Sequence, residues 1–271
     1  MSNLKKFFSV FLAAVIIFIT SNSAFAQNGE DWEKGVIRVV GLGAGPENVG
    51  NFGNFYQKYA QQMAQLDALR NLLEAVGGIE SFDNERVDEI KVKLENTAVS
   101  EIVAKGAYIV ESKFNTDGTC EVTMEMPLFG ENSVAEWRFL NFKNGKKISF
   151  PNPTNIAEIG NEKYTGLIVD CQNLNFVRDI TPEIQNEDKE SVYCAENLNY
   201  DKVFNLVVNS GMVEYTKNIN RQTRAGQNPL TVKAIKVGHG TIIVSNSDAD
   251  KILTANRKFH FLEKCAVVVV Y

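Results

Sequence analysis

The residues best suited to chemistry in this chain are acidic side chains at the ends of predicted elements. Asp170 closes a buried-type strand, a place where α/β proteins often keep groups that face a ligand. Asp248 and Asp250 have the spacing of a DxD metal pair, and they also stand where a helix begins. No further acid or lysine at a neighbouring strand end is recognisable for phosphotransfer at Asp170. We expect loop capping at Asp170 and helix capping at Asp248 and Asp250, with a three-carboxylate catalytic site as the alternative.

Asp67 and Arg70 lie one helical turn apart in a helix predicted over residues 54–76. Such a pair is most often a surface ion pair worth about 0.2–0.5 kcal/mol. The helix face that carries it is also available for contacts between subunits. Asp67, Arg70 and Asp170 are therefore the candidate ligand-binding or interaction residues.

Signatures of catalysis are missing from the sequence. The chain has two histidines and no HExxH, GxSxG or P-loop motif. A glycine-rich run over residues 41–45 follows a predicted strand, but Pro46 and several polar residues separate it from the next helix, which favours a structural turn over a nucleotide loop. We therefore predict a protein that is not an enzyme and that has no catalytic residue, cofactor or metal.

Four cysteines occur without any CxxC spacing. Cys120 and Cys265 lie in strand patterns and are interpreted as small buried hydrophobic residues. Cys171 and Cys194 flank one loop, and they would form a disulfide if their strands were neighbours. The sequence leaves this disulfide open, because it does not set the distance between the two Cα atoms.

The N-terminus has the pattern of a cleaved export signal over residues 1–26. Two lysines precede an apolar run from Phe7 to Ile19, and small residues at Ala24 and Ala26 place the cleavage after Ala26. The run is too short to span a bilayer comfortably, so no transmembrane segment is expected in the mature chain. No cysteine follows the cleavage site, so the protein is not expected to be a lipoprotein. We predict a periplasmic or extracytoplasmic location, with a peripheral place at the outer membrane as one option.

The charge balance argues against nucleic acid as a partner. The chain has 28 basic and 33 acidic residues, a formal net charge of −5, and removal of the signal takes away two lysines and no acid. Mild acidity of this size favours solubility and disfavours binding to anionic polymers or lipids.

Two α/β units are predicted, over residues 35–130 and 161–271, with a connector over 131–160. The first reads strand–helix–helix–strand–strand, with a strand over 35–41, helices over 54–76 and 85–104, and a hairpin of 107–114 with 119–128. This order predicts an antiparallel-rich sheet with a helix across one face. The apolar stripe assigned to the first helix comprises Phe55, Tyr59, Met63, Leu66, Leu69, Leu73 and Val76.

The second unit is predicted to be a mixed α/β domain. It begins with a buried strand over 165–170 and ends with a strand over 265–271 that is apolar on both faces. Between them we expect a short strand at 192–194, a helix over 203–209 capped by Asp201, a hairpin around Gly238–Gly240, and a helix from Ser247 to about Phe259. The overall class is α+β, with two small sandwich-like domains.

Three runs within residues 35–130 resemble the LPP-twenty lipoprotein family, which includes the flagellar envelope protein FlgP and the N-terminal part of FlgT. They are GVIRVVGLGAGPEN, YAQQMAQLDALRNLLEAVGGIE and GAYIVESKFNTDGTCEVTMEMPL. The second unit, with YTGLIVDCQ and FLEKCAVVVV, is similar to a domain that often follows this module in exported bacterial proteins. The resemblance implies a SHS2/dodecin-like first domain and a cell-envelope role without catalysis, in which some members build rings beneath the outer membrane. Many members carry a lipobox cysteine, which this chain lacks.

The sequence thus leads to one main expectation and two alternatives. The main one is an exported, non-enzymatic envelope protein that self-associates, with other envelope or flagellar proteins as further partners. The first alternative is a monomeric periplasmic module that binds a ligand or peptide near Asp170 and the loop to Cys194. The second is an enzyme that uses Asp170, Asp248 and Asp250.

Overall fold

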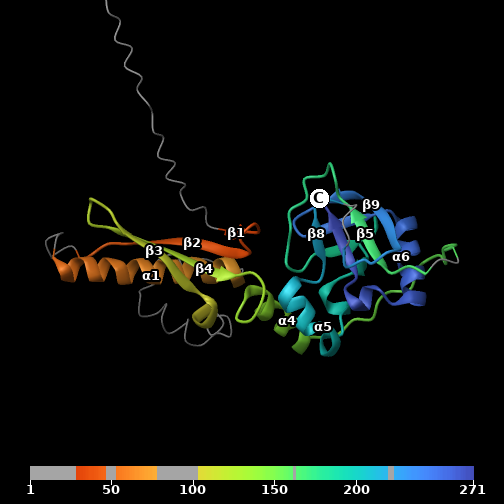
Figure 1. Ribbon diagram of the computed structural model, residues 1–271, viewed down its shortest axis with the longest axis horizontal. Coiled ribbons are helices and arrows are strands. Elements are labelled where there is room, and N and C mark those ends of the chain that lie inside the picture. Colours follow the sequence, from red (N-terminus) through yellow and green to blue (C-terminus); the bar gives the residue numbers. More distant parts are fainter. Residues whose placement is uncertain (1–28, 47–52, 78–102, 161–162, 219–222) are drawn as a thin grey trace, which may run out of the picture.

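The computed structural model describes residues 29–46, 53–77, 103–160, 163–218 and 223–271, and it shows two α/β units joined by a helix (Figure 1). The predicted signal sequence and nearly all of the predicted helix over residues 85–104 lie outside the described residues. The molecule is α+β, with one sheet in each unit. None of the described helices is long and apolar enough to cross a membrane.

The first unit is a four-stranded antiparallel sheet with one long helix, α1 (Asn54–Gly77), along one face (Figure 1). The order across the sheet is β1-β2-β4-β3, in which β3 and β4 form the predicted hairpin. Residues of β4 that face α1, such as Val122 and Met126, are fully buried, as their period-two pattern predicts. The strands are β1 (Gly29–Asp31), β2 (Val36–Gly43), β3 (Tyr108–Phe114) and β4 (Cys120–Pro127).

The glycines predicted to form a turn after β2 belong largely to the strand itself. β2 continues to Gly43 and stays paired with β4 to its end. A Cβ atom added to Gly41 would lie 2.1 Å from the backbone nitrogen of Ala68, and one added to Gly43 would lie 2.2 Å from the carbonyl oxygen of Ala60. The glycines are therefore needed because the backbones of α1 and β2 almost touch.

This close approach also corrects the predicted face of α1. The residues that pack on the sheet are small, with Ala60, Ala64 and Ala68 at i, i+4 and i+8, all fully buried. Leu73 and Val76 of the predicted stripe are buried in the core, in agreement with the prediction, whereas Phe55 and Tyr59 remain 65% and 39% exposed. The prediction is therefore wrong for the first half of α1, where the close contact with β2 requires alanine.

The predicted connector contains a helix, α4 (Val134–Asn144), which packs against α5 of the second unit. Its N-cap is Ser133, whose hydroxyl accepts a hydrogen bond from the Glu136 backbone at 3.1 Å. Phe139 is fully buried, so the connector takes part in the core.

An aromatic contact fastens the first unit to the second. The ring of Trp32, between β1 and β2, lies 6.0 Å from Phe129 and 5.7 Å from Tyr215 of the second unit. The guanidinium of Arg178 lies 5.1 Å from the Trp32 ring and 5.0 Å from the ring of Tyr271. These contacts fix the first unit at the end that carries β1, and the β3–β4 turn projects away from them (Figure 1).

The second unit is a seven-stranded mixed sheet in the order β7-β6-β10-β9-β5-β11-β8. Four neighbours, β9, β5, β11 and β8, are parallel, and β10 returns antiparallel to β9 in the predicted hairpin. The closing strand is buried on both faces between β5 and β8, as predicted. The strands are β5 (Gly166–Asp170), β6 (Glu183–Gln185), β7 (Ser191–Tyr193), β8 (Glu214–Thr216), β9 (Pro229–Val237), β10 (Thr241–Val244) and β11 (Val267–Val270).

The helices of the second unit, α5 (Tyr200–Ser210) and α6 (Asn246–Phe259), share one core with one face of the sheet. Leu167 of β5 belongs to that core, whereas Ile168 packs on the opposite face with Val268, Val270 and Ala225. The cap of α5 is Asn199 and not the predicted Asp201, because the Asn199 side chain accepts from the Asp201 backbone at 3.2 Å. Two short 3₁₀ turns, η1 (Ala195–Asn197) and η2 (Leu262–Lys264), complete the unit.

Candidate assembly surface

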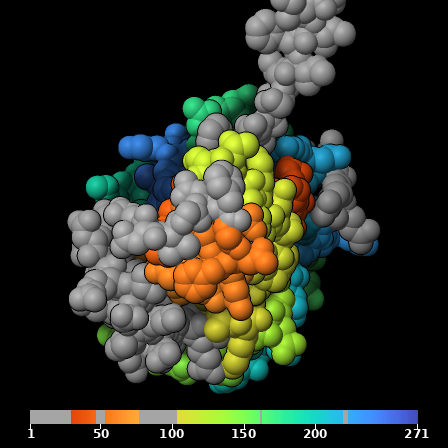
Figure 2. Space-filling model, turned by 90° about the vertical axis from the view of Figure 1, so that its left-hand side faces the viewer, coloured from red at the N-terminus to blue at the C-terminus, as the bar shows by residue number. Residues whose placement is uncertain are grey.

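The most exposed regular element in the described part of the chain is β3, at the edge of the first sheet. All seven of its residues are exposed. Four of them are large and apolar, with 44–48% of each surface accessible: Tyr108, Ile109, Val110 and Phe114. The hairpin lies at the surface beside α1, in yellow to yellow-green next to the orange helix (Figure 2). An open edge with this composition is a template for pairing with another strand.

The hydrogen-bonding groups of β3 alternate between β4 and the open edge. At the hairpin turn the Asn115 backbone donates to the Thr119 carbonyl at 2.8 Å. Because such bonds alternate along an antiparallel pair, Lys113 and Glu111 direct their backbone groups to β4. Ser112 and Phe114 direct theirs outward, and no described strand pairs with that side.

A β-bulge between Ile109 and Glu111 interrupts the regular strand. Bulges of this kind twist an edge and limit how much of it can pair with another chain. The start of β3 is held to β4 by Tyr108, whose hydroxyl donates a hydrogen bond to the buried Glu125 carboxylate at 3.1 Å. Glu125 also forms an ion pair with Arg38 of β2. The regular part of the open edge is therefore Glu111–Phe114.

The opposite edge of the same sheet is closed by side chains of α1. β1 pairs with the first residues of β2 only. Beyond it, the Leu42 backbone donates to the Asp67 carboxylate at 2.9 Å, and the Asn71 amide donates to the Val40 carbonyl at 2.8 Å. Asp67 also forms an i, i+3 ion pair with Arg70. Asp67 therefore caps the open edge of β2, and it also forms the surface ion pair that the sequence predicts.

Asp170 is placed as a loop cap and not in a carboxylate cluster. Its carboxylate accepts a hydrogen bond from the Gln172 backbone at 2.9 Å. Asp170 lies two residues after Ile168 in β5, so the two side chains are on the same face of the sheet, which is the face away from α6. The alternative of a site formed by Asp170 with Asp248 and Asp250 is therefore wrong, because the sheet separates them.

Asp248 and Asp250 have separate tasks at the start of α6. The Asp248 backbone donates to its N-cap residue, Ser245, at 3.1 Å. Asp250 is 9% exposed and accepts hydrogen bonds from the backbones of Thr154 and Asn155 at 2.7 and 3.1 Å. It thereby holds the connector against α6. Within the described ranges there is no group of three potential metal ligands.

The disulfide between Cys171 and Cys194 is not formed, and all four cysteines are free and buried. Three strands, β9, β10 and β6, lie between the strands that these two cysteines follow. At about 4.8 Å per strand their Cα atoms are far beyond the roughly 7 Å limit of a disulfide. Burial raises the pKa of the Cys171 thiol to about 12 and that of Cys265 to about 11, and it also raises the pKa of Cys194.

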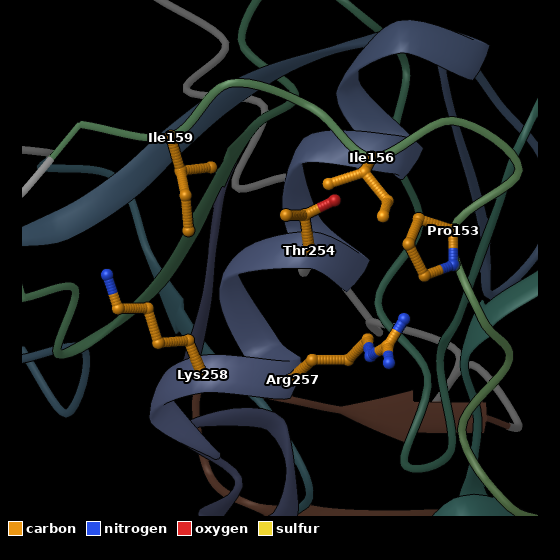
Figure 3. Close-up of a pocket in the computed structure, with 6 residues that line it drawn as sticks. All are labelled: Pro153, Ile156, Ile159, Thr254, Arg257 and Lys258. Carbon is orange, nitrogen blue, oxygen red and sulfur yellow. The ribbon is translucent and has the colours of Figure 1, made fainter.

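A surface hollow lies between the connector and α6, with a cavity volume of about 350 Å³ (Figure 3). Ile156 and Pro153 extend over it from the connector, and Arg257 and Lys258 border it from α6 (Figure 3). Ile156 is 80% exposed. The hollow combines apolar walls with two cations, which suits an anionic ligand with an apolar part.

Sequence reasoning located the β3–β4 hairpin but did not single out the exposed residues of β3. The available signal was the run Tyr108-Ile109-Val110, in which consecutive apolar side chains break the alternation that a half-buried strand requires. It likewise missed Asn71, because an asparagine on a helix gives no sign that it caps a strand edge.

One comparison with known proteins gives a match. The family model described as Treponema pallidum Tp0624, second domain, matches residues 166–271. The matched segment begins with β5 and runs to the end of the chain, so it covers the sheet of the second unit. No curated protein matches the chain.

Proposed function

We propose that this protein is an exported, non-enzymatic component of a bacterial cell envelope that acts by assembling into an oligomer. The observation that carries the proposal is the open edge of β3, where seven consecutive residues are exposed and four are large and apolar. Strand addition at such an edge supplies main-chain hydrogen bonds between subunits without any change of fold.

The resemblance to the LPP-twenty family supports this assignment, since members of that family form envelope structures, some of them at the flagellar motor. An antiparallel sheet with one helix on its face fits the SHS2/dodecin-like fold that the resemblance implies for residues 35–130. The N-terminal pattern with cleavage after Ala26 favours a periplasmic or outer-membrane-associated location without a lipid anchor.

The proposal is tested by light scattering coupled to size exclusion on protein made from the full chain and purified after export. A discrete mass of two or more subunits at micromolar concentration is expected. A strictly monomeric protein at high concentration would refute assembly. Fractionation of the producing cells tests the location, and recovery in the cytoplasmic fraction would contradict export.

The second candidate function is a monomeric periplasmic binding module. The hollow beside α6 favours it, because Arg257 and Lys258 stand next to an exposed apolar wall. Titration calorimetry with laurate as an anionic amphiphile tests this alternative. Saturable binding that is lost when both Arg257 and Lys258 are changed to glutamine would support it, and absence of heat would remove it.

A further inference from the structure

We infer that β3 pairs antiparallel with β3 of a second copy of this chain, with Ser112 opposite its own symmetry mate. This inference rests on the proposed self-association and adds its partner, its surface and its register. The second copy is chosen as the occupant because the exposed stretch of β3 is complementary to itself when reversed.

The backbone groups fix which registers are available. Ser112 and Phe114 direct their N–H and C=O groups to the open edge, whereas Glu111 and Lys113 use theirs toward β4. A pairing centred on Ser112 lets each Ser112 exchange two hydrogen bonds with the other, and the regular pairing ends where Phe114 meets the bulge of the other copy. A pairing centred on Glu111 or Lys113 would align groups that are already bonded to β4.

The charges favour the same register. With Ser112 at the centre, Glu111 of each copy lies opposite Lys113 of the other, so two oppositely charged pairs form by symmetry. Both residues lie on the sheet face away from α1, because they are opposite Thr123 and Glu121 of β4. A register centred on Glu111 or on Lys113 would instead place two like charges face to face.

The resulting dimer is closed and keeps each subunit intact. A two-fold axis perpendicular to the sheet joins the two four-stranded sheets and leaves both α1 helices on one face. Gln61 of α1 already reaches Ser112, at 3.4 Å between Nε2 and Oγ, so the junction is flanked by a polar part of the helix. The bulge before Glu111 limits the pairing to this short stretch.

A disulfide trap tests the register. In Ser112→Cys the two new thiols would face each other across a strand pair, within the roughly 4.4–6.8 Å Cα separation that a disulfide accepts. The four native cysteines are buried and stay out of the reaction. We expect a covalent dimer under mild oxidation of Ser112→Cys. The matched control Lys113→Cys should give no covalent dimer. In this register position 113 of one copy lies opposite Glu111 of the other, so the two new thiols are two residues out of register.

A charge exchange tests the same register without cysteine chemistry. In Lys113→Glu, Glu111 of each copy would lie opposite a second acid at position 113 of the other copy, which makes two like-charge pairs. This variant should raise the dimer Kd by about tenfold or more. The double variant Glu111→Lys/Lys113→Glu restores two opposite-charge pairs and should bring the Kd back near that of the natural chain. An oligomer that forms with no Ser112→Cys cross-link and no response to Lys113→Glu overturns this register and retains assembly through another surface. A chain that stays monomeric overturns both.

Discussion

Adding one methyl group at Gly41 tests whether α1 and β2 are as close as the structure shows. The new Cβ atom of Gly41→Ala would lie 2.1 Å from the Ala68 nitrogen and 2.2 Å from the Ala64 carbonyl oxygen. Ordinary heavy-atom contact begins near 3.5 Å, so helix and strand must separate by more than about 1 Å. Both atoms belong to the helix backbone, so no side chain can move aside to relieve the clash.

The expected cost exceeds that of ordinary overpacking. Overpacking alone costs about 1–3 kcal/mol. A gap of about 1 Å along the alanine row also forfeits up to half of its dispersion contacts. We therefore expect Gly41→Ala to lower the free energy of unfolding by about 3 kcal/mol or more, although alanine in a strand is intrinsically better than glycine by about 0.5–1 kcal/mol.

Urea unfolding followed by circular dichroism measures this change, and amide hydrogen exchange of α1 shows whether the first unit carries it. The matched control is Gly53→Ala, since a Cβ added at Gly53 meets no atom within 4 Å. It should lose no more than about 1 kcal/mol, because Gly53 is the N-cap residue of α1, where glycine is favoured over alanine. If Gly41→Ala cost no more than Gly53→Ala and α1 exchanged no faster, the close packing of helix and strand would be refuted.

Three further predictions concern single groups. Because burial raises the pKa of Cys171 to about 12 and of Cys265 to about 11, native protein at pH 8 should react very slowly with Ellman's reagent, and urea should release all four thiols. Fast labelling without unfolding would contradict this. Asp250→Asn turns an amide donor toward the backbone donors of Thr154 and Asn155, so we expect the free energy of unfolding to fall by about 2–3 kcal/mol and proteolysis near residue 155 to become faster. An unchanged cleavage rate would show that Asp250 does not hold the connector against α6. Asp67→Ala leaves the Leu42 N–H without its acceptor and should cost about 1–2 kcal/mol without changing the oligomeric mass, whereas loss of the oligomer would restore Asp67 as an interface residue.

Elements with a strong local pattern could be predicted from the sequence. The hairpin of β3 and β4, the bounds of α1 and the buried strands β5 and β11 follow from turn residues, helical periodicity and β-branched runs. The helix in the connector was not predicted, because α4 is short and its aromatic residues do not form one clear stripe. Its start is marked by Ser133 and Glu136, a capping pattern that is visible in the sequence.

The error at Gly41 and the disulfide that the sequence left open have a common physical origin. A glycine can form a turn or allow a close backbone contact, and which of the two applies depends on the element that packs against it. For Gly41 this element is α1, whose contacting residues Ala64 and Ala68 are more than 20 positions away in the sequence. Whether Cys171 meets Cys194 depends on the order of strands in the sheet, which places three other strands between them. Both questions are decided by long-range packing, which local patterns do not carry.

The two edges of the first sheet are treated differently, and this difference leads to a last prediction. One edge is closed by Asp67 and Asn71, whereas β3 stays open, and a β3–β3 dimer closes on itself. An assembly larger than a dimer therefore needs a second surface. Phe55 and Tyr59 are exposed on the side of α1 away from the sheet, with ring centroids 6.4 Å apart.

If the natural chain forms more than a dimer, the double variant Phe55→Ser/Tyr59→Ser should stop at the dimer while keeping its fold, because it removes two apolar side chains and touches no residue of β3. Light scattering gives the mass, and circular dichroism confirms the helix. Gln62→Ser is the control, since this exposed polar residue of the same helix can be changed without removing apolar surface. A full-size assembly of the double variant would exclude this face of α1 as the second contact.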